Sequence, residues 1–227
     1  MADAPVLTIR KDWPRIDPAF LKAFAGTPAG NLVDAMGRQG ALHHSIRPVW
    51  NGPAFVGPAL PVWTTARDNL APYAALTVAK PGDVIVVATA GYDQGAVIGD
   101  VMTGLFRNAG VIAVVTDGLV RDIAGIRETG IPVHAAGVSA NSPFKNGPGG
   151  VGVSITLGGM IVEPGDLVLG DSEGVVVCPR ARIAETLEVL KTVRAKEAGM
   201  DKLVRSGARQ PDWLAATLAE KGVRYID

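Results

Sequence analysis

Apolar residues along the chain follow two patterns, short continuous runs and positions spaced three or four residues apart. Continuous runs rich in β-branched residues predict strands that are covered on both faces, and they fall at 83–89, 111–115 and 131–136. Helical spacing predicts helices beside these runs, at 69–80, 101–108 and 123–129. Strand and helix therefore alternate, which is typical of an α/β fold with a covered parallel or mixed sheet.

The two ends of the chain add helices and further strands. Asp17-Pro18 and Thr27-Pro28 each place a good N-cap residue before a proline, which predicts short helices over 17–24 and 27–36. Further strands are expected over 54–65, where prolines interrupt the pattern, over 152–158, and within 166–178. The remaining expected elements are an amphipathic helix over 181–206 and a short helix over 211–220.

We expect a single domain over residues 1–227. With 48% hydrophobic and 19% charged residues, the 227-residue chain can bury one sizeable core. Within it we distinguish an N-terminal arm (1–15), a core (16–180) and the C-terminal helices (181–227). The glycine- and proline-rich segment 139–150, with its lone Lys145, is expected to be a loop that either covers a site or contacts a subunit.

Charge and cysteine content exclude several classes of function. Lys plus Arg equals Asp plus Glu at 22 each, so no global field recruits nucleic acid or an anionic membrane. The single cysteine, Cys178, lies in a strand pattern and is expected to be buried and inert. Without a signal-like segment or an apolar run of membrane-spanning length, we expect a cytoplasmic protein.

The segment from Gly95 to Asp122 carries the strongest chemical signal. Gly95 and Gly99 bracket a predicted turn that opens a helix. The strand that follows, 111–115, leads through the polar turn Thr116-Asp117-Gly118 to Arg121 and Asp122. A helix start has unpaired backbone N–H groups that favour an anion, so residues 99–102 (Gly99, Asp100, Val101, Met102) could hold a carboxylate. Ligands of α/β sheets usually lie at such strand ends.

Arg121 and Asp122 complement this turn chemically. The guanidinium of Arg121 suits a carboxylate or an enolate oxygen, and the carboxylate of Asp122 is a hard ligand for Mg²⁺ or Mn²⁺. Together they predict a site for a small 2-oxo acid. The competing interpretation is that Asp122 caps the next helix and Arg121 pairs with an acid on the surface.

The histidines and the predicted helix over 27–36 give weaker signals. His43 and His44 are adjacent and cannot share one helix face, and the distant His134 does not complete a zinc site. Asn31 and Asp34 could face a site or solvent, and solvent is the expected environment.

Seven short motifs between about Thr27 and Arg180 resemble, in their order, the 4-hydroxy-4-methyl-2-oxoglutarate / 4-carboxy-4-hydroxy-2-oxoadipate aldolases and the related regulators of ribonuclease activity A. The motifs are NLVDAMG (31–37), VGPA (56–59), KPGDV (80–84), AVIGD (96–100), DGLVRD (117–122), GIPV (130–133) and EPGDLVLGDSEGVVV (163–177). The segment 139–150 departs from the aldolase pattern.

The resemblance implies a swivelling β/β/α fold, a homotrimer or homohexamer, and a metal-dependent lyase. Such a lyase releases pyruvate from a 4-hydroxy-2-oxo diacid by retro-aldol cleavage, often also decarboxylating oxaloacetate, through a pyruvate enolate. It implies that Asp122 binds the metal directly, that Arg121 offsets the enolate charge, and that Asp100 holds metal-bound water. In these relatives an acid of the C-terminal helix reaches a neighbouring subunit's site, which corresponds to Glu197. Without the resemblance, Glu197 would be expected to pair with Arg194 or Lys196 on the surface.

Two alternatives remain. A non-catalytic binding protein like the ribonuclease regulators would share the fold. A methyltransferase, a name also attached to this family, would be expected to show a Gly-x-Gly-x-x-Gly turn after an early strand, and the sequence has none there.

Overall fold

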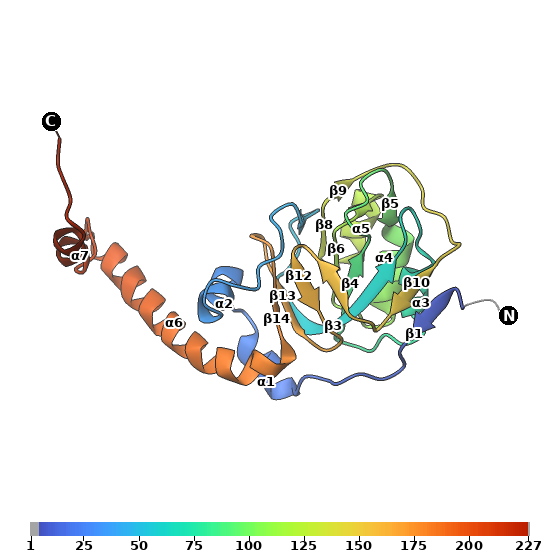
Figure 1. Ribbon diagram of the computed structural model, residues 1–227, viewed down its shortest axis with the longest axis horizontal. Coiled ribbons are helices and arrows are strands. Elements are labelled where there is room, and N and C mark those ends of the chain that lie inside the picture. Colours follow the sequence, from blue (N-terminus) through green and yellow to red (C-terminus); the bar gives the residue numbers. More distant parts are fainter. Residues whose placement is uncertain (1–4, 227) are drawn as a thin grey trace.

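The computed structural model describes residues 5–226, which form one large mixed sheet, two small sheets and helices around them (Figure 1). The large sheet has nine strands. Seven of them follow one path, in the order β1 (Leu7–Ile9), β10 (Gly149–Val151), β3 (Phe55–Thr64), β4 (Val84–Ala88), β6 (Ala113–Thr116), β8 (Val133–Ala135) and β2 (Arg47–Pro48). The other two, β13 (Leu167–Gly170) and β14 (Val175–Cys178), extend from β3.

Strand β3 links the two parts of this sheet. Residues 55–58 pair antiparallel with β13, and residues 59–63 pair parallel with β4. The expectation that prolines would break this strand is wrong, because it runs unbroken for 10 residues. A proline removes a donor but keeps its carbonyl, and the carbonyl of Pro61 accepts a 2.8 Å bond from the amide of Gly152.

The central strands are covered on both faces, as their continuous apolar runs predict. In β4, Ile85 and Val87 pack into the core cluster that contains Phe106 and Ile126, whereas Val84 and Val86 pack into the cluster that contains Leu157. Each of these four valine and isoleucine side chains is fully buried. Burying such a side chain stabilises the fold by roughly 1.5–3 kcal/mol, so β4 and its neighbours fix the body on which the loops are placed.

The helices lie in two groups. In the first, α4 (Asp100–Asn108) packs against α5 (Ile123–Thr129), while α3 (Leu70–Ala75) packs on β3 and β10. In the second, α1 (Pro18–Phe24) and α2 (Ala29–Ala35) pack on α6 (Ile183–Arg205), which follows the short 3₁₀ helix η1 (Arg180–Arg182). Helix α6 then runs away from the sheets and carries α7 (Leu214–Lys221) at its far end (Figure 1).

The two small sheets occupy segments where the sequence pattern is least clear. Strands β5 (Ala96–Ile98), β7 (Leu119–Val120) and β9 (Gly137–Val138) form a parallel sheet, and β11 (Ile155–Leu157) pairs with β12 (Met160–Val162). The predicted turn from Gly95 to Gly99 is thus a buried strand. The predicted strand over 152–158 is shorter than expected, because only residues 155–157 form β11, between Gly152 and Gly158, whose φ angles are +67° and +57°. Three-residue strands such as β5 depend on distant partners, which local patterns do not reveal.

The predicted N-cap of α1 is confirmed, whereas that of α2 is wrong. The carboxylate of Asp17 accepts the Ala19 amide at 2.8 Å at the start of α1. The expected Thr27 cap of α2 is wrong, because Pro28 occupies the N-cap position and the Ala29 amide donates instead to Asp171 Oδ2 at 2.8 Å. A residue far along the chain therefore caps this helix.

The mixed α/β architecture with N-terminal helices and a long C-terminal helix matches the predicted fold class. Residues 1–4 of the predicted N-terminal arm lie outside the described residues, and the rest of the arm adds β1, which pairs parallel with β10. No helix within residues 5–226 combines the length and apolar character that a bilayer crossing requires.

Candidate active site

The predicted residues 99–102, Arg121 and Asp122 all line one cavity of about 180 Å³. The small sheet β5-β7-β9 places them together, because β5 ends just before Gly99 and β7 ends just before Arg121. The backbone amide of Arg121 donates to the carbonyl of Ile98 at 3.0 Å, which joins the two strand ends directly. The prediction that the helix start and the Arg-Asp pair form one site is therefore geometrically correct.

The first turn of α4 has backbone N–H groups available to a ligand. Gly99 is the N-cap, and the first backbone bond of the helix is from the Thr103 amide to the Gly99 carbonyl at 3.0 Å. The amide of Val101 is already bound by Asp100 Oδ1 at 2.7 Å. Within residues 5–226, the amides of Asp100 and Met102 have no such acceptor, so they are the donors that could hold an anion.

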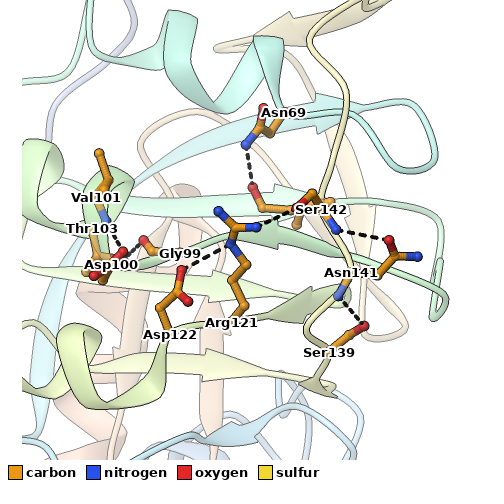
Figure 2. A network of polar contacts seen from close by, with 11 residues as sticks. Asn69, Gly99, Asp100, Val101, Thr103, Arg121, Asp122, Ser139, Asn141 and Ser142 are labelled. Atoms are coloured by element: carbon orange, nitrogen blue, oxygen red, sulfur yellow. Dashed lines mark hydrogen bonds and ion pairs between the residues drawn. The ribbon is translucent and has the colours of Figure 1, made fainter.

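The competing interpretation of Asp122 and Arg121 holds only in part. The side chain of Asp122 does not cap α5, but Arg121 does pair with a partly exposed acid, which is Asp122 itself. Asp122 occupies the N-cap position with φ +59° and ψ +45°, and its carboxylate makes no capping bond. Instead Asp122 Oδ2 lies 3.0 Å from Arg121 Nε (Figure 2). A left-handed conformation costs a non-glycine residue about 1–2 kcal/mol, less for aspartate. The backbone strain therefore lies at the proposed metal ligand.

Two glycines make room for the two carboxylates of the site. A Cβ atom added to Gly99 would lie 2.9 Å from Asp122 Oδ2 and 3.5 Å from Arg121 Nε. A Cβ atom added to Gly125, in α5, would overlap Asp100 Oδ2. Asp100 is thus enclosed between the start of α4 and α5, with one oxygen on a backbone amide, which suits a fixed acceptor more than a metal ligand.

The donor set fits a hard cation that keeps most of its water. Among the described residues 5–226, no three His, Cys, Asp or Glu side chains are grouped as a protein-enclosed metal site requires. The cavity offers the carboxylates of Asp100 and Asp122, and the Asp122 side chain is 43% exposed. Mg²⁺ and Mn²⁺ accept such a site, because one carboxylate and several waters can complete the coordination shell.

Four polar residues of the cavity were not predicted as site residues. They are Asn69, Tyr73, Ser142 and Lys145. Ser142 and Lys145 come from the 139–150 loop, so the loop lines the site, as the first of its two predicted roles requires. Gly149 and Gly150, at its end, belong to β10. Nothing local marks Asn69 and Tyr73, because α3 reaches the cavity only through tertiary packing.

These residues give the cavity a second polar wall. Arg121 Nη1 donates to Ser142 Oγ at 2.6 Å, and the ammonium of Lys145 lies 5.7 Å from the ring centroid of Tyr73. Asn69 is 6% exposed and donates through Nδ2 to the Val97 carbonyl at 3.2 Å (Figure 2). Its Oδ1 atom is buried without a hydrogen-bond partner among the described residues.

Glu197 lies elsewhere in the molecule. Its carboxylate accepts a hydrogen bond from the Asn31 side chain in a cavity of about 500 Å³ between α2 and α6. Arg194 does not pair with it, because Arg194 Nη2 binds the carbonyl of Ala23 and the hydroxyl of Thr27. Asn31 is 8% exposed, so its expected solvent environment is wrong, whereas Asp34 is exposed at the edge of the same cavity.

The other candidates singled out in the sequence are outside this site. Burial raises the pKa of the Cys178 thiol, which opposes formation of a nucleophilic thiolate and supports the inert assignment. Burial lowers the pKa of His134, whose Nε2 atom lies 2.8 Å from the Asp171 carbonyl. The rings of His43 and His44 are tilted against one another with centroids 4.2 Å apart, and neither residue lines the cavity.

Comparison with known proteins agrees with this fold. A family model described as "RraA-like: Aldolase/RraA" matches residues 29–177. The chain is 32% identical over 185 residues to a Halalkalibacterium halodurans protein named "Putative 4-hydroxy-4-methyl-2-oxoglutarate aldolase", covering 82% of this chain and 88% of that protein.

Two solved structures share the fold over most of the chain. An uncharacterized protein from Pseudomonas syringae pv. tomato has a TM-score of 0.76 at 26% identity, covering 86% of this chain and 96% of that one. Streptomyces coelicolor RraAS2, described as an unusual member of the RNase ES inhibitor RraA family, has a TM-score of 0.75 at 24% identity, covering 84% and 99%. The chain therefore belongs to the RraA-like family, which its matching model describes as Aldolase/RraA.

Proposed function

We propose that this protein is a divalent-metal-dependent lyase that releases pyruvate from a 4-hydroxy-2-oxo diacid and also decarboxylates oxaloacetate. The observation that carries the proposal is the meeting of three features in one cavity. These are the free amides at the start of α4, the guanidinium of Arg121 and the carboxylate of Asp122. A 2-oxo acid needs an anion site, a cation near its keto oxygen and a metal ligand, and this cavity offers all three.

Each residue then has a defined task. The amides of Asp100 and Met102 bind the substrate carboxylate, and Arg121 stabilises negative charge on the C2 oxygen as the carbon–carbon bond breaks. Asp122 would hold Mg²⁺ or Mn²⁺, with Asp100 accepting hydrogen bonds from its waters. When bound, the metal would act as a Lewis acid that stabilises the negative charge of the enolate.

A second cation lines the cavity and suits the second carboxylate of a diacid. Lys145 is exposed on the loop that lines the cavity, and its ammonium is held beside Tyr73. Within residues 5–226 it makes no salt bridge that would neutralise it. A cation in this position favours substrates with a distal negative charge over pyruvate-like monoacids.

We further propose that the active unit is a homo-oligomer, a trimer or hexamer, in which Glu197 of one subunit reaches the cavity of another. Exposed apolar side chains near the cavity support an interface there, since Val101 is 67% and Phe144 55% exposed. Val101 lines the cavity itself, and Phe144 lies between Pro143 and Lys145, which also line it.

A pyruvate-release assay tests the proposal. After treatment with EDTA, the protein should release pyruvate from oxaloacetate and from 4-hydroxy-4-methyl-2-oxoglutarate only when Mg²⁺ or Mn²⁺ is restored. No release from either substrate at saturating metal would contradict the lyase assignment. Inhibition of an endoribonuclease by the same preparation would instead support the alternative function, a non-catalytic ribonuclease regulator. RraAS2 is described as a member of such a family, the RNase ES inhibitors.

A further inference from the structure

The hydroxyl of Ser142 has its hydrogen-bond roles fixed by its neighbour. Its partner, Arg121 Nη1, lies 2.6 Å from Ser142 Oγ. A guanidinium has only donors, so in this contact the hydroxyl oxygen must accept. The O–H of Ser142 is then directed elsewhere, and no acceptor for it lies within residues 5–226. Because Ser142 lines the cavity, a bound ligand can supply that acceptor.

The backbone around Ser142 is held by the same small sheet that forms the anion site. The amide of Ser139 donates to the Val120 carbonyl at 2.9 Å, and the amide of Ala96 donates to the Asn141 carbonyl at 3.0 Å. Strands β5 and β7 therefore fix the position of Ser142 relative to Gly99 and Arg121 (Figure 2).

A second set of contacts holds the loop from the outside. Arg67 Nη2 donates to Asn141 Oδ1 at 2.9 Å, and the guanidinium of Arg67 lies 4.9 Å from the ring centroid of Phe144. The amide of Phe144 donates to the Arg67 carbonyl at 2.8 Å. Arg67 adopts φ +55°, a conformation that arginine rarely takes and that this contact set maintains. Ser142 is thus pre-positioned before a ligand binds.

From these contacts we propose that Ser142 is a substrate-binding residue, which donates its O–H to the anionic oxygen that Arg121 also binds. This inference rests on the proposed function, and it deepens it by adding a donor to the oxygen on which enolate charge develops. A hydrogen bond between a neutral donor and a charged acceptor is stronger than a neutral one, and Ser142 donates without adding a second positive charge. The residue comes from the loop that departs from the aldolase pattern.

The test compares Ser142→Ala with Ser142→Thr, which keeps the hydroxyl, and with Ser139→Ala as a matched control. Ser139 lies in the same loop, but within residues 5–226 its hydroxyl binds only the Asn141 amide, at 3.2 Å. We expect kcat/KM for oxaloacetate to fall roughly 10- to 100-fold in Ser142→Ala, with most of the loss restored in Ser142→Thr. Ser139→Ala should stay within about twofold of the wild type, because its hydroxyl does not reach Arg121.

Binding of pyruvate to the Mg²⁺-saturated protein, measured by titration calorimetry, provides a readout separate from turnover. A direct contact predicts that Ser142→Ala weakens pyruvate binding about tenfold or more. Unchanged pyruvate affinity with reduced kcat would overturn the direct contact, because Ser142 would then act only by orienting Arg121. Equal losses in Ser139→Ala would overturn it too, by assigning the effect to loop packing. Absence of both pyruvate release and pyruvate binding in the wild type would instead refute the proposed function.

Discussion

At the scale of single residues, the chemistry depends on two adjacent side chains that the backbone turns toward one another. Arg121 follows an extended strand, whereas Asp122 takes a left-handed conformation at the start of α5. The change of backbone direction brings Arg121 Nε and Asp122 Oδ2 to 3.0 Å. Both side chains are more than a third exposed, so the ion pair adds little stability, and its position beside the cavity is the better reason for the geometry.

Asp122→Ala should abolish measurable turnover, because it removes the proposed direct metal ligand. Even an outer partner of a metal ligand typically contributes about 10- to 100-fold, so the loss should exceed 100-fold or so. Alanine is disfavoured at φ +59°, so Asp122→Asn serves as the second variant, since asparagine tolerates this conformation. Circular dichroism should show an intact fold for Asp122→Asn, together with weaker Mn²⁺ binding by electron paramagnetic resonance. Full activity of either variant at saturating metal would refute the assignment.

Arg121→Lys should lose most activity, by roughly 10- to 100-fold in kcat. The guanidinium contacts Asp122 through Nε and Ser142 through Nη1 at the same time, and a single ammonium cannot reproduce this fork. Arg107→Lys, on α4, is the control, because Arg107 Nη2 donates to the exposed Asn108 Oδ1 at 3.4 Å and Arg107 does not line the cavity. A near-normal kcat for Arg121→Lys would mean that Arg121 does not bind the reacting oxygen.

At the scale of secondary-structure elements, the cavity forms where two short strands end beside the 139–150 loop. Strands β5 and β7 deliver the start of α4 and the Arg-Asp pair, and the 139–150 loop delivers Ser142 and Lys145. Shortening this loop should raise KM or change substrate preference, because it would displace both residues. Arg67 and Asp68 anchor the loop, since Arg67 binds Asn141 and Asp68 Oδ2 accepts the Asn146 amide. A deletion would disturb these anchors as well, so point variants separate the contributions of Ser142 and Lys145 more cleanly.

Lys145→Ala should raise KM for a diacid such as oxaloacetate by about tenfold, with a smaller change in kcat, because it removes the cation proposed to bind the distal carboxylate. Lys80→Ala is a closely matched control. The ammonium of Lys80 lies 5.6 Å from the ring centroid of Trp13, much as that of Lys145 lies 5.7 Å from that of Tyr73. Lys80 does not line the cavity, and its ammonium also lies 3.5 Å from Asp12 Oδ1. If KM values are unchanged in Lys145→Ala, the loop contributes to subunit packing instead.

At the scale of the whole molecule, the two groups of candidate residues are separated within one chain. Glu197 lies between α2 and α6, which leave the body on the side away from α4 and α5 (Figure 1). Helix α6 is mostly exposed over residues 194–205, and α7 buries no residue. A helical segment without tertiary contacts is only marginally stable in water. The exposed end of α6 therefore favours contact with another subunit.

A subunit-mixing test examines whether Glu197 completes a neighbouring site. Asp122→Ala subunits still carry Glu197, and Glu197→Ala subunits still carry Asp122, so exchange between the two inactive oligomers should regenerate some complete sites. Glu188→Ala is the control on the same helix, because Glu188 pairs with Lys191 at 2.7 Å and should remain active. If mixed oligomers stay inactive after exchange is confirmed by mass spectrometry, the active site is not shared between subunits.

The sequence alone determined the elements whose stability is local or whose burial is complete. The continuous apolar runs fixed β4 and β6 as strands covered on both faces, and Asp17-Pro18 fixed the start of α1, because such signals need no distant partner. It also identified the six residues 99–102, 121 and 122 that line the cavity, because the helix start at Gly99 and the Arg-Asp pair are both visible in the chain. The strand that was predicted to lead to this pair is β6, however, and β7 is the strand that ends just before Arg121.

Only the tertiary structure decided which distant segments complete the site. Strands β5, β7 and β9 are two or three residues long and exist through pairing with one another, so a turn was the better local prediction for 95–99. Asp171 caps α2 from across the chain, Glu197 binds Asn31, and Ser142, Asn69 and Lys145 reach the cavity from separate elements. These contacts join residues far apart in sequence, and local hydrophobic period and turn chemistry carry no information about such pairings.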